Sequence, residues 1–251
     1  MQQKKWLFIS AVPAMILCLV ATAVMATELN SADIGTRLAN FLRVAPEGDA
    51  STTQFAYKAW SSYPGRYLVA HYENVDLDKL QDSMLPINID VVEERNGKLA
   101  HVANGKHPFA IDFSSLPQIG LDTARYELKK GLVAFGLNMS GSSSQAMGGL
   151  SSTGRFLMIV DGATVRDVAG PFPTESEYGE PAPECSDCLQ RTVTRGVITM
   201  SDRSTNGYRD IIFKQTEKTW IDGRTEEKSA PVTVRTELYC WDGARYQKAN
   251  K

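Results

Sequence analysis

The chain has 251 residues, of which 43% are hydrophobic, and its 27 basic and 29 acidic side chains give a formal net charge of −2. This length is enough for one large domain or two small ones with a buried core. The nearly balanced charge argues against a nucleic-acid-binding protein, which would carry a basic surface.

Residues 1–26 have the features of a secretory signal peptide. Lys4 and Lys5 precede an apolar run over residues 6–24, and small residues ending at Ala26 form a cleavage site. A permanent membrane anchor is the alternative, because the run is just long enough to span a bilayer. We predict an exported bacterial envelope protein, periplasmic or secreted, that meets the membrane only transiently through this signal.

One helix is predicted directly after the signal peptide, over residues 30–44. Ser31 is a suitable N-cap, and apolar residues such as Ile34 and Leu38 recur at helical spacing. A second, weaker helical pattern covers residues 75–84.

The rest of the chain has mainly β patterns. Apolar and polar residues alternate over residues 87–94, and Asn96-Gly97 separates this segment from residues 99–102. Asn-Gly between two such segments predicts a hairpin, because both residues accept positive φ. Residues 156–160 and 163–168 predict a second hairpin. Further strands are expected over residues 126–137, 219–221 and 232–241. We predict a mainly β (α+β) fold of antiparallel hairpins in one or two sheets with one N-terminal helix.

Two segments show no periodicity. Residues 138–154 are rich in serine and glycine, and residues 170–188 carry four prolines and several acids. We interpret the first as a long loop and place a domain boundary in the second, between an N-terminal domain over residues 27–180 and a C-terminal module over residues 181–251. Long loops often bind partners or are simply mobile. The candidate binding residues of the loop are Ser142, Ser143, Ser144, Gln145 and Met147.

Three cysteines follow the signal peptide, at Cys185, Cys188 and Cys240. In an oxidising compartment they are disulfide candidates. Either Cys185 joins Cys188 in a small local ring, or one of the two pairs with Cys240. A redox site is disfavoured, because Glu184 and Asp187 would raise the pKa of a neighbouring thiol.

The segment from Asp202 to Asp210 has oxygen-bearing side chains at the first, third, fifth and ninth positions and Gly207 at the sixth. It resembles the calcium loops of FG-GAP and VCBS-type repeats. The resemblance implies ligands from Asp202, Ser204, Asn206 and Asp210. Two carboxylates of the family pattern are missing, so weak calcium binding is expected. The alternative is a polar turn leading into a strand.

His71, His101 and His107 are the only histidines. No common nucleophile, zinc-protease or phosphate-binding motif accompanies them. His101 is expected on a hairpin strand and His107 in a loop. No residue is therefore singled out as catalytic.

The sequence favours a non-catalytic protein that binds a macromolecular partner, either another protein or an envelope component, as an inhibitor or immunity-type protein would. An envelope hydrolase with a dispersed active site and a calcium-stabilised structural module are the alternatives. No cofactor is expected apart from weakly bound calcium.

Overall fold

In the computed structural model, the description covers residues 34–45, 53–73, 75, 84–110, 116–145, 148–183, 185–223 and 230–249. The chain divides into two compact units, residues 1–43 and residues 44–251, which are considered separately. In the first unit a helix spans residues 34–42, as predicted there. The signal peptide and residues 76–83 of the weaker predicted helix lie outside the description. In the portion of the chain that is described, no helix has the length and apolar character needed to cross a membrane.

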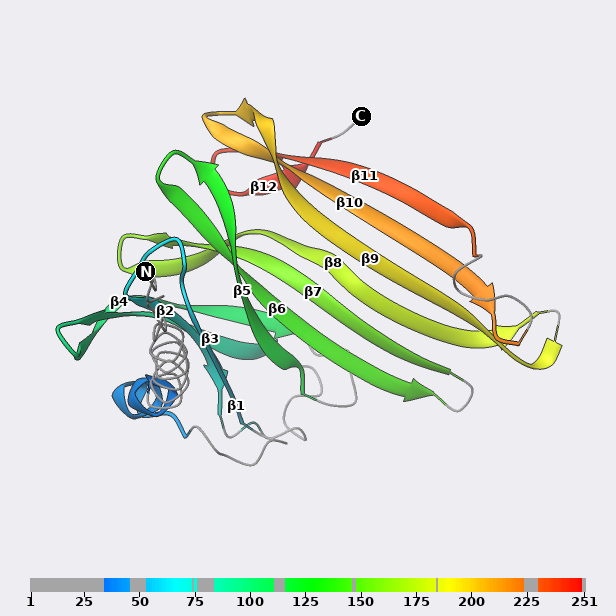
Figure 1. Cartoon of the computed structure of the whole chain (residues 1–251), viewed down its shortest axis with the longest axis horizontal. Coiled ribbons are helices and arrows are strands. Elements are labelled where there is room, and N and C mark those ends of the chain that lie inside the picture. Colours follow the sequence, from blue (N-terminus) through cyan, green and yellow to red (C-terminus); the bar gives the residue numbers. More distant parts are fainter. Residues whose placement is uncertain are drawn as a thin grey trace, which may run out of the picture. The chain divides into compact units, whose positions relative to one another are not determined.

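The second unit consists of strands, which confirms the predicted mainly β fold (Figure 1). The strands are β1 (Gln54–Ala59), β2 (Arg66–Tyr72), β3 (Met84–Arg95), β4 (Lys98–Ala110), β5 (Gln118–Lys129), β6 (Leu132–Gln145), β7 (Gly148–Asp161), β8 (Thr164–Ala182), β9 (Cys185–Thr205), β10 (Tyr208–Ile221), β11 (Val232–Trp241) and β12 (Tyr246–Lys248).

All these strands belong to one branched sheet. The main order is β1-β2-β3-β4-β8-β9-β10-β11-β12, and β5, β6 and β7 form a branch that joins at β8. Neighbouring strands are antiparallel except at β4 and β8, which touch in parallel at Asn104 and Thr164. Gly105 permits this contact, because a Cβ atom there would lie 2.1 Å from the carbonyl oxygen of Val165.

The branching creates two hydrophobic cores. In the first core, side chains of β2, β3 and β4 pack with those of β5, β6 and β7; Leu68, Ile89 and Phe135 are fully buried members. In the second core, β5 to β8 pack with β9 to β12; Phe172 and Phe213 lie there with their ring centroids 5.3 Å apart. Strands β5 to β7 thus contribute to both cores through their opposite faces.

Tight turns join several of the hairpins. Asn96 and Gly97 have φ values of 52° and 75°, and Asn206 and Gly207 have values of 53° and 79°. Both pairs form two-residue connections, because Arg95 pairs with Lys98 and Thr205 pairs with Tyr208. The hairpins predicted around Asn96-Gly97 and Asp161-Gly162 are confirmed.

The long loop predicted over residues 138–154 is wrong. Most of this segment is the far part of the β6–β7 hairpin, with Ser140 opposite Thr153 and Gln145 opposite Gly148. Serine and glycine occupy both faces here, so the alternation that identifies a strand is missing. The proline-rich segment is also extended, and the position predicted for a domain boundary falls within the paired end of β8 and β9.

Candidate functional site

A row of polar side chains crosses one face of β6, β7, β8 and β9. Directly opposite residues of paired strands share a face, and the register places Ser140 opposite Thr153, which is opposite Glu175, which is opposite Arg195. A second row runs through Ser142, Ser151 and Glu177, which is opposite Val193 of β9. Arg191 lies two residues from Val193 on the same face of β9. We call this set the polar strip: Ser140, Ser142, Ser151, Thr153, Glu175, Glu177, Arg191 and Arg195.

Two hollows follow the polar strip. The first, of about 250 Å³, is lined by Gln118 and by five residues of the strip: Ser140, Ser142, Ser151, Thr153 and Glu175. The second, of about 480 Å³, is lined by the end of the same hairpin together with Glu177, Leu189 and Arg191. Ser142 and Ser151 line both hollows. The two hollows are therefore lined by hydroxyl groups of β6 and β7 and by the charged side chains of Glu175, Glu177 and Arg191 on β8 and β9.

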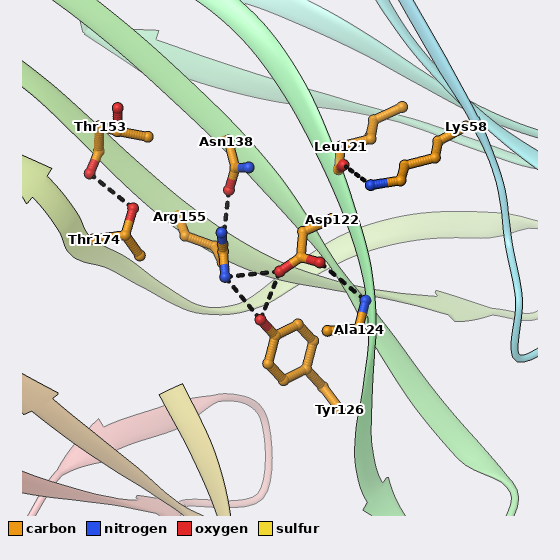
Figure 2. A network of polar contacts seen from close by, with 9 residues as sticks. All are labelled: Lys58, Leu121, Asp122, Ala124, Tyr126, Asn138, Thr153, Arg155 and Thr174. Carbon is orange, nitrogen blue, oxygen red and sulfur yellow. Dashed lines mark hydrogen bonds and ion pairs between the residues drawn. The ribbon is translucent and has the colours of Figure 1, made fainter. Parts of the chain in front are cut away.

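Arg155 organises the end of the strip nearest the cores (Figure 2). Its Nη1 lies 2.7 Å from Oδ2 of Asp122 and donates a hydrogen bond of 2.8 Å to the Tyr126 hydroxyl. Its Nε donates to Oδ1 of Asn138 at 2.7 Å. Two residues further along β6 and β7, Ser140 and Thr153 share a hydrogen bond of 2.9 Å. The Arg155 network therefore lies directly beside the strip, and the first two strip residues, Ser140 and Thr153, hold each other in place.

The network also sets the ionisation of its members. Burial alone would raise the pKa of the Asp122 carboxyl. Hydrogen bonds from Tyr126 and from the Ala124 N–H, together with the charges of Arg155 and Lys58, outweigh burial and hold this pKa below its usual value. Burial and the hydrogen bond to Asp122 raise the pKa of Tyr126 to about 12. At neutral pH the site therefore contains a carboxylate, a guanidinium and a neutral phenol.

The other end of the strip carries a second arginine. Arg191 forms ion pairs of 2.7 Å with both Glu177 and Asp222, and Asp222 also accepts a hydrogen bond from the Trp220 indole. Arg191 and Trp220 are cross-strand neighbours on β9 and β10. These groups are partly exposed, so they remain accessible to a ligand. The charged end combines two carboxylates, one guanidinium and an aromatic ring.

The predicted binding residues occupy different positions in the hairpin. Ser142 is exposed on the strip, whereas Ser143 points to the opposite face, where it is half-buried. Ser144 and Gln145 belong to the paired backbone of β6, and their side chains lie outside the description. Met147 also lies outside it. Of the five residues, the described geometry therefore places Ser142 on the strip.

The residues predicted for calcium lie on the β9–β10 hairpin. Asp202 is exposed and pairs with Arg209 at 3.4 Å, whereas Asp210 is buried. Asn206 occupies the turn, with its amide donating to the Trp241 carbonyl, and Ser204 lies on β9. In the described portion, no group of three or more His, Cys, Asp and Glu residues is arranged to hold a metal. Calcium binding by this segment stays a prediction.

The local disulfide is the one that forms. Cys185 and Cys188 are bonded, with their Cα atoms 5.3 Å apart, at the start of β9. Cys240, on β11, is a free thiol. The longer ring through Cys240, left open by the sequence, is therefore not formed.

Two histidines flank one carboxylate outside the strip. Nε2 of His71 lies 3.2 Å from Oδ2 of Asp90, and Nε2 of His101 lies 2.7 Å from Oδ1. His101 is on a hairpin strand, as expected. The loop position predicted for His107 is wrong, because this residue is buried in β4 with its ring 4.2 Å from that of Phe156. Burial lowers the pKa of His107 by more than the negative charge of Asp167 raises it, so the imidazole is neutral at pH 7.

Sequence reasoning missed Asp122, Arg155 and Arg191. They are far apart in the chain and belong to no short motif, so only the strand register brings them to the polar strip. A usable signal was Arg155 itself, a charged residue directly before the apolar segment 156–160. No family model matches this chain, and no curated protein or solved structure is significantly similar to it.

Proposed function

We propose that this protein is a non-catalytic binding protein that recognises a macromolecular partner through the polar strip. The observation that carries this proposal is the extension of β6 to β9 well past the cores (Figure 1). Such a strand extension contributes little apolar burial, so stability alone does not account for it. A rigid sheet that presents adaptable hydroxyl groups is well suited to recognition.

The chemistry of the strip favours a polar partner. Serine and threonine hydroxyls both donate and accept hydrogen bonds, and the ends of the strip add Arg155 and Arg191 with their carboxylates. A partner surface that carries both donors and acceptors, such as an exposed segment of another protein, would complement this arrangement. An inhibitor or immunity-type role in the bacterial envelope fits these properties.

The proposed location is the periplasm or the cell exterior. Its support is the signal-like composition of residues 1–26 together with the Cys185–Cys188 disulfide, which is typical of oxidising compartments. The envelope hydrolase remains the alternative from a different class, and the His71–Asp90–His101 cluster is where its activity would be sought.

The test is affinity capture from envelope extracts with residues 27–251, followed by titration of the isolated partner. Ser142→Lys combined with Ser151→Lys would place two bulky charges on the strip, and we expect at least about tenfold weaker binding, equivalent to about 1.4 kcal/mol. Ser204→Lys, on an exposed position of β9 away from the strip, controls for an added surface charge and should bind like the wild type.

Two outcomes would contradict the proposal. Equal binding by the strip variant and the control would remove the strip as the recognition surface. Turnover of a cell-wall or lipid substrate that is lost in His101→Ala would favour the hydrolase instead.

A further inference from the structure

The last long strand of the sheet is covered along only part of its outer edge. Short β12 pairs with Tyr239, Cys240 and Trp241, and the Ala249 N–H donates to the Leu238 carbonyl at 2.8 Å. The outer edge of residues 232–237 faces no other strand among those described. The opposite end of the sheet differs, because β1 is tied to β5 by side-chain hydrogen bonds such as Lys58 to the Leu121 carbonyl.

The existing bonds show which backbone groups of β11 point outward. In an antiparallel ladder the N–H and C=O of alternate residues face the same neighbour. The Leu238 carbonyl faces the outer edge, and the register of β11 with β10 is continuous from Val232 to Tyr239. The N–H and C=O groups of Val232, Val234 and Thr236 therefore also face outward.

The side chains at these three positions suit strand pairing. Val232 and Val234 are 53% and 52% exposed, and Thr236 is exposed on the same face. All three are β-branched, which favours packing against a neighbouring strand. Long exposed apolar edges are usually protected from other strands by charges or by bulges. Here one charge, on Arg235, interrupts residues 232–236.

We propose that a second copy of this chain pairs with this edge, so that two β11 strands run antiparallel about a two-fold axis at Val234. This register places Val234 opposite Val234 and Val232 opposite Thr236 of the second copy, and each of these pairs exchanges outward N–H and C=O groups. It leaves Leu238 bonded to Ala249. A two-fold axis at Arg235 or Thr236 would need the backbone groups of Leu238 for pairing with the second copy, but its carbonyl already accepts a hydrogen bond from Ala249. The axis at Arg235 would also set two guanidinium groups face to face.

The occupant is a second copy because β11 is complementary to itself. On one face of the joined strands, Val234 would contact Val234 of the second copy, and Val232 would contact its Thr236. On the opposite face Arg235 would lie opposite Thr233, so no like charges are directly paired. The polar strip on β6 to β9 takes no part in this contact, and the dimer would present two strips.

The test measures self-association of residues 27–251 in a Cys240→Ser background. We expect a concentration-dependent dimer in sedimentation equilibrium. Val234→Lys would place two ammonium groups face to face and should weaken dimerisation at least about tenfold. Val197→Lys changes a valine of β9 that is 57% exposed and lies away from the edge, so it should leave dimerisation unchanged.

Cysteine cross-linking tests the register independently of stability. Directly opposite residues that exchange hydrogen bonds have Cα atoms about 5.5 Å apart, within reach of a disulfide. Val234→Cys should therefore form a covalent dimer on mild oxidation, and Thr236→Cys should not. A monomer at every concentration, a dimer unaffected by Val234→Lys, or cross-linking through Thr236→Cys alone would overturn the proposal.

Discussion

The two halves of β6 differ in what their side chains do. In the first half, Phe135, Leu137 and Met139 are buried in a hydrophobic core. In the second half, from Ser140 onward, serine and glycine replace them, although the backbone continues in the same ladder with β7. One strand is thus buried at one end and presents a polar surface at the other. The rigidity of the surface is supplied by the core half.

The largest expected effect comes from the core half. Phe135→Ala removes a fully buried ring that contacts Trp60 at a centroid distance of 5.3 Å. We expect a loss of about 3–5 kcal/mol in the free energy of unfolding, measured by urea denaturation. A loss below about 1 kcal/mol would mean that the first core does not hold the hairpin.

The next effect comes from the junction between the two halves. Asp122→Asn removes the charge that pairs with Arg155, and we expect it to reduce stability by about 1–3 kcal/mol at pH 7. Tyr126→Phe provides a milder control, because it removes one hydroxyl from the network and leaves the ion pair.

The same carboxyl group predicts a pH dependence. Its pKa is lower in the folded protein than in the unfolded chain, where it is about 3.9. Its stabilising contribution is therefore complete above the unfolded pKa and is lost as the pH falls through the folded pKa. Thermal melts from pH 6 to pH 2 should show a smaller acid-induced loss in Asp122→Asn than in the wild type. Parallel curves would contradict the assignment.

A smaller effect is expected from the disulfide at the far end of β8 and β9. Its ring is short, with a sequence separation of 3, so it restricts the unfolded chain little. Replacing both Cys185 and Cys188 with serine should lower the free energy of unfolding by no more than about 2 kcal/mol. Chemical denaturation of this variant beside the oxidised wild type measures the effect, and the reduced wild type should resemble the variant. A loss as large as that of Phe135→Ala would show that the far end contributes to the stability of the whole sheet.

The smallest effect is expected on the polar strip itself. Ser142→Ala and Ser151→Ala change exposed positions, so each should shift stability by less than about 0.5 kcal/mol. Differential scanning calorimetry measures this directly. If either substitution destabilised the protein by more than about 1 kcal/mol, the strip would be a structural element and the contrast within β6 would fail.

The sequence predicted the strands best where one face is buried and the connection is short. Asn96-Gly97 identified its hairpin because its backbone conformation is rare for other residues. Residues 138–154 failed because both faces of the far hairpin carry small polar side chains, which produce no period-two signal. The site was harder still, because the register of five strands brings Asp122 to Arg155 and places Arg191 at the other end of the same strip, and local patterns do not encode that register.

The position of β8 limits how the molecule can be divided. β4 receives its second neighbour at Thr164, far along the chain, and the same β8 later pairs with β7 and β9. A fragment that stopped after the β6–β7 hairpin would leave β4 and β7 each without its second neighbour, β8. Recombinant truncations after Asp161 should therefore aggregate, and any shortened version needs to retain the whole of β8.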